Sequence, residues 1–241
     1  MESAEYARLH ELEERHFWYV GLRALLDGAL RRWGGARVLD AGCGTGGFLR
    51  TRPDATGVDR SALALEYCTR RGLRRLAQAD VARLPFRDAT FDAVVSADVL
   101  YHRAVADDAV ALAELARVVR PGGHVFLNLP AGRALRGAHD DFVHGARRYS
   151  RADVARLAAR AGLLTVRITS WNAALLPAAF VLRRLSRRGP ARSDVSLPPA
   201  PLNATLGIWL RAEAACSLRL GLPWGLSIFA VLRRPAPAQF P

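Results

Sequence analysis

The sequence predicts an α/β protein with a Rossmann-like, doubly wound sheet of seven mostly parallel strands, an N-terminal helical lid and a helical insertion before the last strand. Three observations lead to this fold class. Short apolar runs alternate with helical patterns, the first run leads into a glycine-rich turn, and the 241 residues (51% hydrophobic, 24% charged) have a globular composition. Because parallel strands need crossover connections, such a sheet binds ligands at the carboxyl ends of its strands.

The first half of the chain supplies most of the alternation. Residues 4–32 have apolar side chains at helical spacing and predict one helix, which Gly34 ends. Ser61 is expected to cap a helix over 61–71, and another helix covers 107–119 before an Arg-Pro-Gly-Gly turn. Strands are expected where apolar runs meet turn residues, at 37–40, 55–58, 73–79, 91–96 and 124–129.

Beyond residue 130 the pattern is looser. A polar loop over 131–149 precedes a helix that Ser150 opens, with Asp153 at its third position. The elements expected next are a strand at 163–169, an apolar helix at 173–185, a linker at 187–201, a helix at 202–220, a strand at 226–233 and a disordered tail from 235. We expect one domain with three parts, a helical cap (1–35), a Rossmann-like core (36–170) and a C-terminal part (171–241).

Charge is distributed unevenly along the chain. The formal net charge is +13, and all 35 basic residues are arginine, which indicates codon bias and does not by itself predict a nucleic-acid partner. Residues 1–130 carry a net charge of +1, whereas 131–241 carry +12. This difference predicts that an anionic acceptor, or the surface that presents it, approaches the C-terminal half. A solvated arginine surface is the alternative.

The cysteines and the apolar stretches bear on the compartment. Cys43, Cys68 and Cys216 lack metal-ligand spacing, so we expect a cytoplasmic protein without a disulfide framework or a zinc site. The acidic N-terminus does not resemble a secretory signal. The longest apolar stretch, 173–182, is about half as long as the ~20 residues that cross a bilayer, so no transmembrane helix is expected.

The run 38–47 (VLDAGCGTGG) leads a strand into a turn where side chains would collide with a bound ligand. Glycine permits that close approach. The run also matches the dinucleotide pattern G-x-G-x-x-G, and a tight turn without a ligand is the alternative. Asp59, nineteen residues after Asp40, ends the next strand and is placed to accept hydrogen bonds from two ribose hydroxyls. A surface aspartate that caps the following helix is the alternative for Asp59.

Four ordered motifs within residues 36–130 resemble class I S-adenosylmethionine-dependent methyltransferases, in the methyltransferase type 11 group that includes ubiquinone and menaquinone C-methylases. They are VLDAGCGTGGFL, ATGVDRS, QADVARLPF with FDAVVSADVLYH, and ELARVVRPGGHVFLNLPA. The resemblance implies S-adenosylmethionine as cofactor, with Asp59 at the ribose. It implies cofactor contacts from Asp40, Gly42, Cys43, Gly44, Gly46, Asp59, Arg60, Asp80, Val81, Ser96 and Ala97. Asp80 and Val81 would contact adenine, and Ser96 and Ala97 the methionine side.

Two further segments, around 16–19 and 139–149, resemble a less described subgroup found beside glycosyltransferase or natural-product genes, which implies a small-molecule acceptor. The substrate contacts expected are His16, Trp18, Tyr19, Tyr101, Arg147, Arg148 and Tyr149. The aromatic residues at 16–19 also predict that the N-terminal helix closes over cofactor and acceptor, with plain helix packing as the alternative.

Methyl transfer is an in-line displacement, so the protein must chiefly align the acceptor and exclude water. A hydroxyl or carbon acceptor needs a general base, and the candidates are His102, His139 and His144. The alternative for each histidine is a structural role in its loop. A metal site from His139, Asp140 and His144 has no recognisable spacing, so no metal is expected.

We therefore expect an S-adenosylmethionine-dependent methyltransferase with a small-molecule acceptor of anionic, natural-product, sugar or lipid-linked type. The alternatives are an NAD-dependent oxidoreductase, favoured only by the G-x-G-x-x-G match, and a non-catalytic methyltransferase-like protein, against which the intact glycine turn argues. No nucleic-acid module is recognisable, so no nucleic-acid partner is expected. The apolar helix at 173–185 and the arginines after it permit peripheral contact with an anionic membrane. The sequence indicates no oligomeric state.

Overall fold

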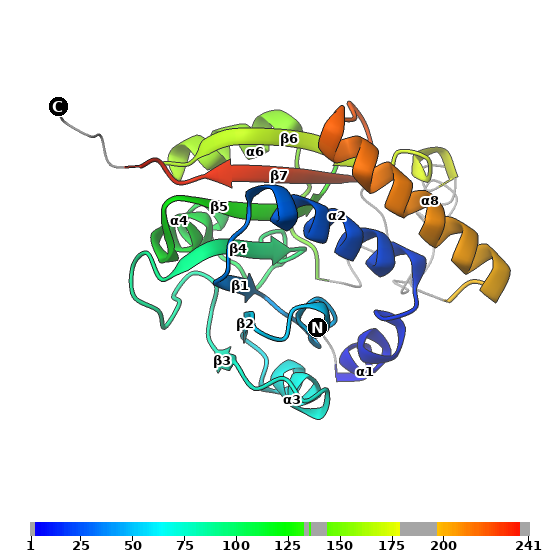
Figure 1. Cartoon of the computed structure of the whole chain (residues 1–241), viewed down its shortest axis with the longest axis horizontal. Helices are drawn as coiled ribbons and strands as arrows, with labels where there is room; N and C mark the ends of the chain where they lie inside the picture. Colours follow the sequence, from blue (N-terminus) through cyan, green and yellow to red (C-terminus); the bar gives the residue numbers. More distant parts are fainter. Residues whose placement is uncertain (1–2, 133–134, 136–143, 179–196, 237–241) are drawn as a thin grey trace.

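The computed structural model of the chain describes residues 3–132, 135, 144–178 and 197–236. Its centre is a seven-stranded sheet with the strand order β3-β2-β1-β4-β5-β7-β6 (Figure 1). The strands are β1 (Val38–Ala41), β2 (Thr56–Asp59), β3 (Leu76–Gln78), β4 (Phe91–Ala97), β5 (Val119–Pro130), β6 (Leu164–Trp171) and β7 (Ser227–Arg233). The five neighbouring strands β3, β2, β1, β4 and β5 are parallel to one another, whereas β7 pairs antiparallel with both β5 and β6. This confirms the predicted fold class.

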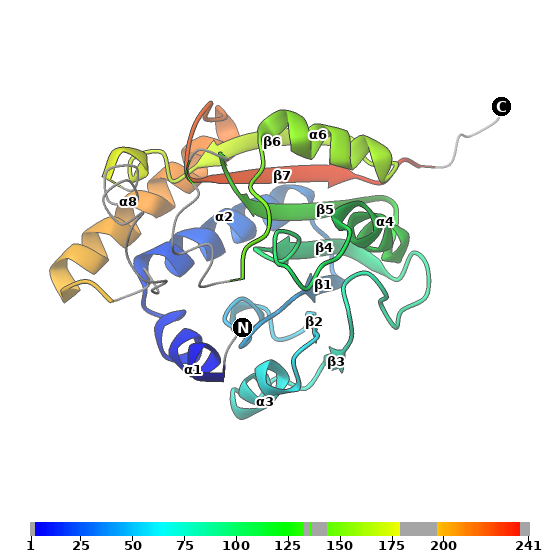
Figure 2. The same ribbon diagram turned by 180° about the vertical axis from the view of Figure 1, so that it is seen from behind.

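Helices cover both faces of the sheet. They are α1 (Ser3–Leu12), α2 (Phe17–Trp33), α3 (Ala62–Arg70), α4 (Asp108–Val118), α6 (Arg151–Arg160) and α8 (Ala200–Arg219), with a short 3₁₀ helix η1 (Leu49–Thr51). Helices α2 and α8 lie on one face, and α4 and α6 on the other (Figures 1 and 2). Helices α1 and α3 lie side by side near the β3 edge of the sheet.

Alternating side chains on the strands build two cores. In β5, Phe126 points into the core under α2 and α8, whereas Val125 and Leu127 point into the core under α4 and α6. In β7, Phe229 likewise points into the core under α2 and α8, and Ala230 points into the core under α4 and α6. Because successive side chains of a strand point to opposite faces, a strand covered on both sides is apolar throughout.

Two predicted helix starts are confirmed by their caps. The Ser61 hydroxyl accepts a hydrogen bond from the Ala64 amide at 3.3 Å. At α6, Ser150 and Asp153 form a reciprocal capping box, in which each side chain binds the other residue's amide. Such caps satisfy amide groups that the first helical turn leaves without partners.

Two sequence-based expectations were wrong. Residues 4–32 form two helices, because His16 adopts an extended backbone and caps the start of α2. The helix before the Arg-Pro-Gly-Gly segment ends as expected, at Val118, but the strand after it begins at Val119 and not at residue 124, so that β5 includes this segment. The register between β4 and β5 is irregular here, and Gly122 has a φ angle of +79°.

Some expectations fall on residues 179–196 and 237–241, outside the described ranges. Most of the apolar helix at 173–185, most of the linker and the end of the tail therefore stay predictions, as does the division into three parts. Across the described ranges, no helix combines the length and the apolar character that crossing a bilayer requires.

Candidate functional site

The glycine turn follows β1 and is fixed to β2. The amides of Gly42 and Cys43 both donate to the Val58 carbonyl, at 2.7 and 2.9 Å. Gly42, Gly44 and Gly46 have φ angles of +88°, +54° and +86°, which side chains disfavour. A Cβ atom on Gly42 would also overlap Val99 Cγ2 and lie 3.0 Å from its Cγ1. The backbone path here therefore requires glycine.

Asp59, at the end of β2, ties the glycine turn to the start of α3. Its Oδ2 accepts a hydrogen bond from the Gly44 amide at 2.9 Å, and its Oδ1 accepts one from the Ser61 amide at 2.8 Å. Each carboxylate oxygen has a second lone pair. Asp59 can therefore hold the turn and still accept hydrogen bonds from a ligand.

Other carboxyl groups surround this turn. Burial raises the pKa of Asp40 to about 8, with smaller contributions from Asp59 and Glu13. Burial raises the pKa of Asp98 to about 7. The side-chain amide of Asn128, which donates to Asp98 Oδ2 at 2.9 Å, lowers this pKa by a smaller amount. The pKa values of Glu13 and Asp59 are raised by burial as well. Carboxyl groups crowded in this way favour a cationic ligand, which would stabilise their charged forms.

Asp98 was not among the predicted site residues. It follows β4 directly, at φ +57°, and its amide donates to the Asn128 carbonyl at 2.9 Å. The Asn128 side chain is fully buried, and its Oδ1 accepts from Trp171 Nε1 at 2.7 Å. A non-glycine residue at positive φ, held by a buried polar network, is typical of a functional site. The signal in the sequence was Asn128, a polar residue within an apolar strand.

Helix α1 and the turn after it cover the glycine turn. Leu9 Cδ2 lies 3.6 Å from the position that a Cβ atom on Gly44 would take. The buried Glu13 accepts a hydrogen bond from the Thr45 hydroxyl and forms an ion pair with Arg71 at 2.9 Å. The side chains of Arg71 and Glu13 are only 5% and 9% exposed, so this ion pair is largely desolvated.

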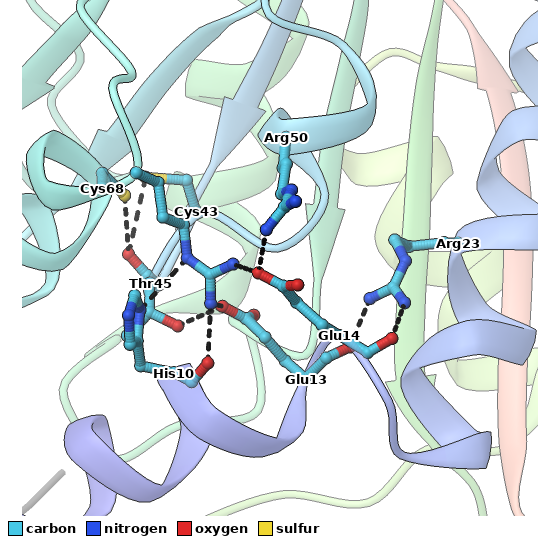
Figure 3. Close-up of polar contacts among 10 residues, drawn as sticks. His10, Glu13, Glu14, Arg23, Cys43, Thr45, Arg50 and Cys68 are labelled. Atoms are coloured by element: carbon cyan, nitrogen blue, oxygen red, sulfur yellow. Dashed lines mark hydrogen bonds and ion pairs between the residues drawn. The ribbon is translucent and has the colours of Figure 1, made fainter.

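Further arginine contacts fix the same segment. Figure 3 shows Arg50 reaching Glu14 and Arg23 reaching the backbone carbonyls of Glu13 and Glu14. Arg71 also donates to the His10 carbonyl at 2.8 Å. Glu13 and Arg71 were not among the predicted site residues, because the two partners are 58 residues apart in the chain and carry no local motif.

The predicted aromatic segment at 16–19 packs between helices. His16 Nδ1 accepts from the Trp18 amide at 3.3 Å, and the ring centroids of Trp18 and Trp171 are 5.9 Å apart. Tyr19 differs, since its pKa is raised by burial and by the nearby charges of Glu13 and Asp98. Tyr19 thus lies near enough to these carboxyl groups to sense their charge, whereas the contacts with the glycine turn come from Leu9 and Glu13.

The histidine candidates lie on the loop after β4 and in the segment that approaches it. His102 Nδ1 accepts a hydrogen bond from the Ala104 amide at 3.0 Å, and burial lowers the pKa of His102 to about 4. Its ring centroid lies 5.8 Å from that of His144. His102 is therefore a weak base with one ring nitrogen in use. His139 lies outside the described residues.

The predicted acceptor-binding arginines have intramolecular partners. Arg147 donates to the carbonyls of Val105 and Ala106 at 2.9 and 2.7 Å, and Arg148 donates to the Ala131 carbonyl at 2.8 Å. The Tyr149 hydroxyl donates to Asp108 at 2.8 Å, and the amides of 146 and 147 donate to the Tyr101 carbonyl. These bonds hold the segment 145–149 against the loop after β4, and acceptor binding by these residues stays a prediction.

A cavity of about 530 Å³ opens between α4 and α6. Its lining residues are Asp108, Gly145, Ala146, Arg147, Arg148, Tyr149, Asp153, Arg156, Leu157 and Arg160. None of them belongs to the glycine turn or to the carboxyl groups around it. The cavity therefore shares no lining residue with the turn at the ends of β1 and β2.

The family described as Methyltransferase domain, of type 11, matches residues 39–127. Residues 39–127 form a methyltransferase domain. The match begins in β1, includes the glycine turn, Asp59 and Asp98, and ends in β5. It confirms the resemblance to methyltransferases of type 11, which implies S-adenosylmethionine as the cofactor.

Curated relatives resemble the methyltransferase domain over part of their length. A tRNA (carboxymethyluridine(34)-5-O)-methyltransferase of Arabidopsis thaliana is 38% identical over 98 residues, which cover 39% of this chain and 24% of that protein. A fatty-acid O-methyltransferase of Mycolicibacterium smegmatis is 42% identical over 100 residues, covering 37% of this chain and 35% of that protein. The chain thus covers about a quarter to a third of the length of these relatives.

Solved structures share the fold over nearly the whole chain. A chain from the complex between the Haloferax volcanii Trm112 methyltransferase activator and a methyltransferase has a TM-score of 0.64 and 23% identity. The similarity covers 98% of this chain and 97% of that one. An S-adenosylmethionine-dependent methyltransferase from Thermotoga maritima has a TM-score of 0.61 and 18% identity, covering 96% and 95%. At these identities the similarity establishes the fold.

The residues of the methyltransferase domain fit a cationic sulfonium cofactor. The positive-φ glycines leave room for a ligand at the turn, and the carboxyl groups around it favour positive charge. The buried Ser96 hydroxyl, near the end of β4, has no hydrogen-bond partner among the described residues. Asp80 accepts from the Ala82 amide at 2.9 Å, and Arg60 is exposed and donates to the Ala104 carbonyl at 3.4 Å. Individual cofactor contacts stay predictions.

Affinity for S-adenosylmethionine is expected to rise about threefold or more between pH 6 and pH 8, because the cation favours ionised Asp40 and Asp98. The stability of the ligand-free protein should change in the opposite direction. Both folded-state pKa values are raised, so their contribution to stability is complete at low pH and is lost as pH rises toward 7–8. Calorimetric titration and thermal unfolding across this range measure both trends. If the affinity and the stability depended on pH equally in wild type and in Asp98→Asn, a role for Asp98 would be contradicted.

Proposed function

We propose that this methyltransferase domain transfers a methyl group from S-adenosylmethionine to a carboxylate oxygen of its acceptor, forming a methyl ester. The state of His102 supports this proposal. Its low pKa and its occupied Nδ1 make it a poor base for removing a proton from a hydroxyl or carbon acid. A carboxylate is ionised at neutral pH and needs no base.

The bound cofactor supplies an electrophilic methyl group on a sulfonium sulfur. In the transfer the carboxylate oxygen forms the new bond to carbon, the carbon–sulfur bond breaks, and its electron pair stays on sulfur. The chain contributes alignment and exclusion of water. The glycine turn and Asp59 position the cofactor, and α1 with Glu13 covers the turn.

The names of two relatives agree with this chemistry. One is named for oxygen methylation of carboxymethyluridine in tRNA and the other for oxygen methylation of a fatty acid, so both acceptors contain a carboxyl group. The anionic acceptor predicted from the charge of 131–241 is of the same class. We propose a small carboxylic acid as the acceptor.

A tRNA acceptor is the second candidate. The tRNA-directed relatives support it, as does the net charge of +12 on residues 131–241, which suits a phosphate backbone. The structural similarity to a chain from a complex with a Trm112 activator suggests that such an enzyme would act with a small protein partner.

The acceptor is tested by incubating the protein with methyl-labelled S-adenosylmethionine and three acceptor sets. These are long-chain fatty acids, the nucleoside carboxymethyluridine, and tRNA that contains it, the last with and without a Trm112-type activator. Labelled product is expected with a carboxylic acid, and mild alkali should release the label as methanol. Label that resists alkali would contradict ester formation, and label only in tRNA would favour the second candidate.

Asp59→Ala is expected to weaken binding of S-adenosylhomocysteine by about 1–3 kcal/mol, or about 5- to 150-fold, because charge-assisted hydrogen bonds are lost. Asp59→Asn retains one acceptor oxygen and should lose less. The exposed Asp54→Ala, on the loop before β2, is the matched control. Calorimetry measures all three. Unchanged affinity in Asp59→Ala would remove the ribose assignment.

A further inference from the structure

Helix α8 is apolar on both of its sides. Its inner side packs against α2 through Gly207, Leu210 and Ala214. Its outer side faces solvent and carries large apolar side chains, since Leu202, Ile208 and Trp209 are 51%, 68% and 57% exposed. Figure 1 shows α8 at the outer edge of the molecule, beside α2. A surface helix normally has a polar outer side, so α8 departs from the usual pattern.

The exposed apolar side chains are concentrated at this helix. Nine large hydrophobic residues are exposed in the described part of the chain, and six of them lie between 197 and 224. They are Leu197, Leu202, Ile208, Trp209, Leu220 and Trp224. Single exposed apolar residues are common, but a cluster of this kind marks an interaction surface.

The spacing of these residues aligns them along the helix. Leu202 and Trp209 are seven residues apart, and Trp209 and Leu220 are eleven apart. Both separations are close to whole numbers of helical turns, so the three side chains lie on one line. The exposed half of the helix also carries Ile208 and Arg219 and, at the margin opposite this line, Arg211. We call this exposed half, from Leu202 to Leu220, the α8 outer face.

The charges on the α8 outer face have one sign. Arg211 and Arg219 are exposed. The one acidic residue of α8, Glu213, is occupied elsewhere, because its two carboxylate oxygens accept hydrogen bonds from the amides of Ala173 and Ala174 at 2.8 and 3.4 Å. The α8 outer face therefore combines tryptophan, leucine and isoleucine with two exposed arginines, and its one carboxylate, Glu213, is held by backbone amides.

We propose that the α8 outer face binds the surface of a membrane that contains anionic phospholipids. Tryptophan and leucine side chains enter the boundary between headgroups and acyl chains, and arginines pair with the phosphates. The twenty-residue helix is about 30 Å long and would lie flat along the membrane. It does not meet the requirements for crossing one.

Charge favours a membrane over a second copy of the chain. In a twofold symmetric dimer the same face meets itself, so Arg211 and Arg219 of both copies would be buried together. The one carboxylate of α8, on Glu213, already accepts hydrogen bonds from the amides of Ala173 and Ala174. An anionic surface supplies that neutralisation directly. The proposal is independent of the acceptor proposed above, because it concerns binding alone.

Vesicle sedimentation tests the proposal without acceptor or cofactor. Wild-type protein is mixed with vesicles of phosphatidylcholine alone or of phosphatidylcholine with phosphatidylglycerol. We expect sedimentation with the anionic vesicles and little with the neutral ones. The double variant Ile208→Ser with Trp209→Ser should reduce the bound fraction at least tenfold. The exposed Val110→Ser on α4, at 53% exposure, should bind as wild type does.

A second pair of variants tests the arginines. Arg211→Gln with Arg219→Gln should weaken binding to anionic vesicles at least tenfold, whereas the exposed pair Arg74→Gln with Arg160→Gln, with the same change in net charge, should weaken it less. Unfolding curves and S-adenosylhomocysteine affinity establish that each variant is folded. Equal binding to neutral vesicles, or no effect of either α8 variant, would overturn the proposal. So would a wild-type dimer that Trp209→Ser converts to a monomer.

Discussion

Gly42→Ala is expected to abolish measurable S-adenosylmethionine binding and to lower the free energy of unfolding by about 2–5 kcal/mol. Two causes add. The residue adopts φ +88°, which a side chain disfavours, and the new methyl group would overlap Val99, a short and stiff side chain that has little freedom to move. The turn must then shift away from Val58, whose carbonyl holds it at 2.7 and 2.9 Å.

Gly72→Ala separates the two causes. Gly72 has a similar φ of +81°, but a Cβ atom there would meet nothing within 4 Å. The Gly72→Ala variant should therefore lose about 1–2 kcal/mol of its free energy of unfolding through backbone strain alone, and its cofactor affinity should not change. Urea denaturation and calorimetry with S-adenosylhomocysteine measure both quantities. Equal losses in the two variants would show that close approach at Gly42 is unimportant.

Arg71→Gln is expected to lower the free energy of unfolding by about 3–5 kcal/mol, since it leaves the buried carboxylate of Glu13 without its charged partner. The same change should release α1 from the glycine turn and raise hydrogen exchange in residues 5–13. Cofactor affinity should fall with it, because the cover over the turn is lost.

Arg70→Gln is the matched control for this substitution. Arg70 neighbours Arg71 and also pairs with a glutamate, but the side chains of Arg70 and Glu66 are 57% and 55% exposed. Exposed pairs contribute about 0–1 kcal/mol, so its effect should be small. The double variant with Glu13→Gln should recover part of the lost stability. No difference between Arg70→Gln and Arg71→Gln would exclude the buried pair as a determinant of the closed arrangement.

Much of the fold followed from local sequence signals. Strand positions near β1, β2 and β4, the capping box at Ser150 and the order of helices and strands were evident from periodicity and turn residues. Such features depend on neighbours in the chain. The break between α1 and α2 was missed because apolar spacing continues through it, while the cap at His16 depends on its backbone conformation.

The candidate site also contains residues that a local motif predicts and residues that only the folded structure reveals. The glycine turn and Asp59 were found because a contiguous motif encodes them, and the family match includes both. Glu13 and Arg71 are 58 residues apart, and their pairing depends on how α1 folds back over the turn. Arg147 and Arg148 were expected to bind an acceptor, which stays a prediction, and the structure adds that both donate to backbone carbonyls. The residue type indicates that both side chains are charged, but it does not indicate which acceptor groups they contact in the folded chain.

The position of β7 has a consequence for how the protein is made. Strand β7 lies between β5 and β6, and among the described strands β6 pairs with β7 alone. A ribosome synthesises β6 before residues 227–233 exist, so the nascent chain carries β6 as an unpaired strand for that interval. Long-range pairing of this kind slows folding and exposes surfaces that chaperones bind. The sheet can close only after synthesis has passed β7.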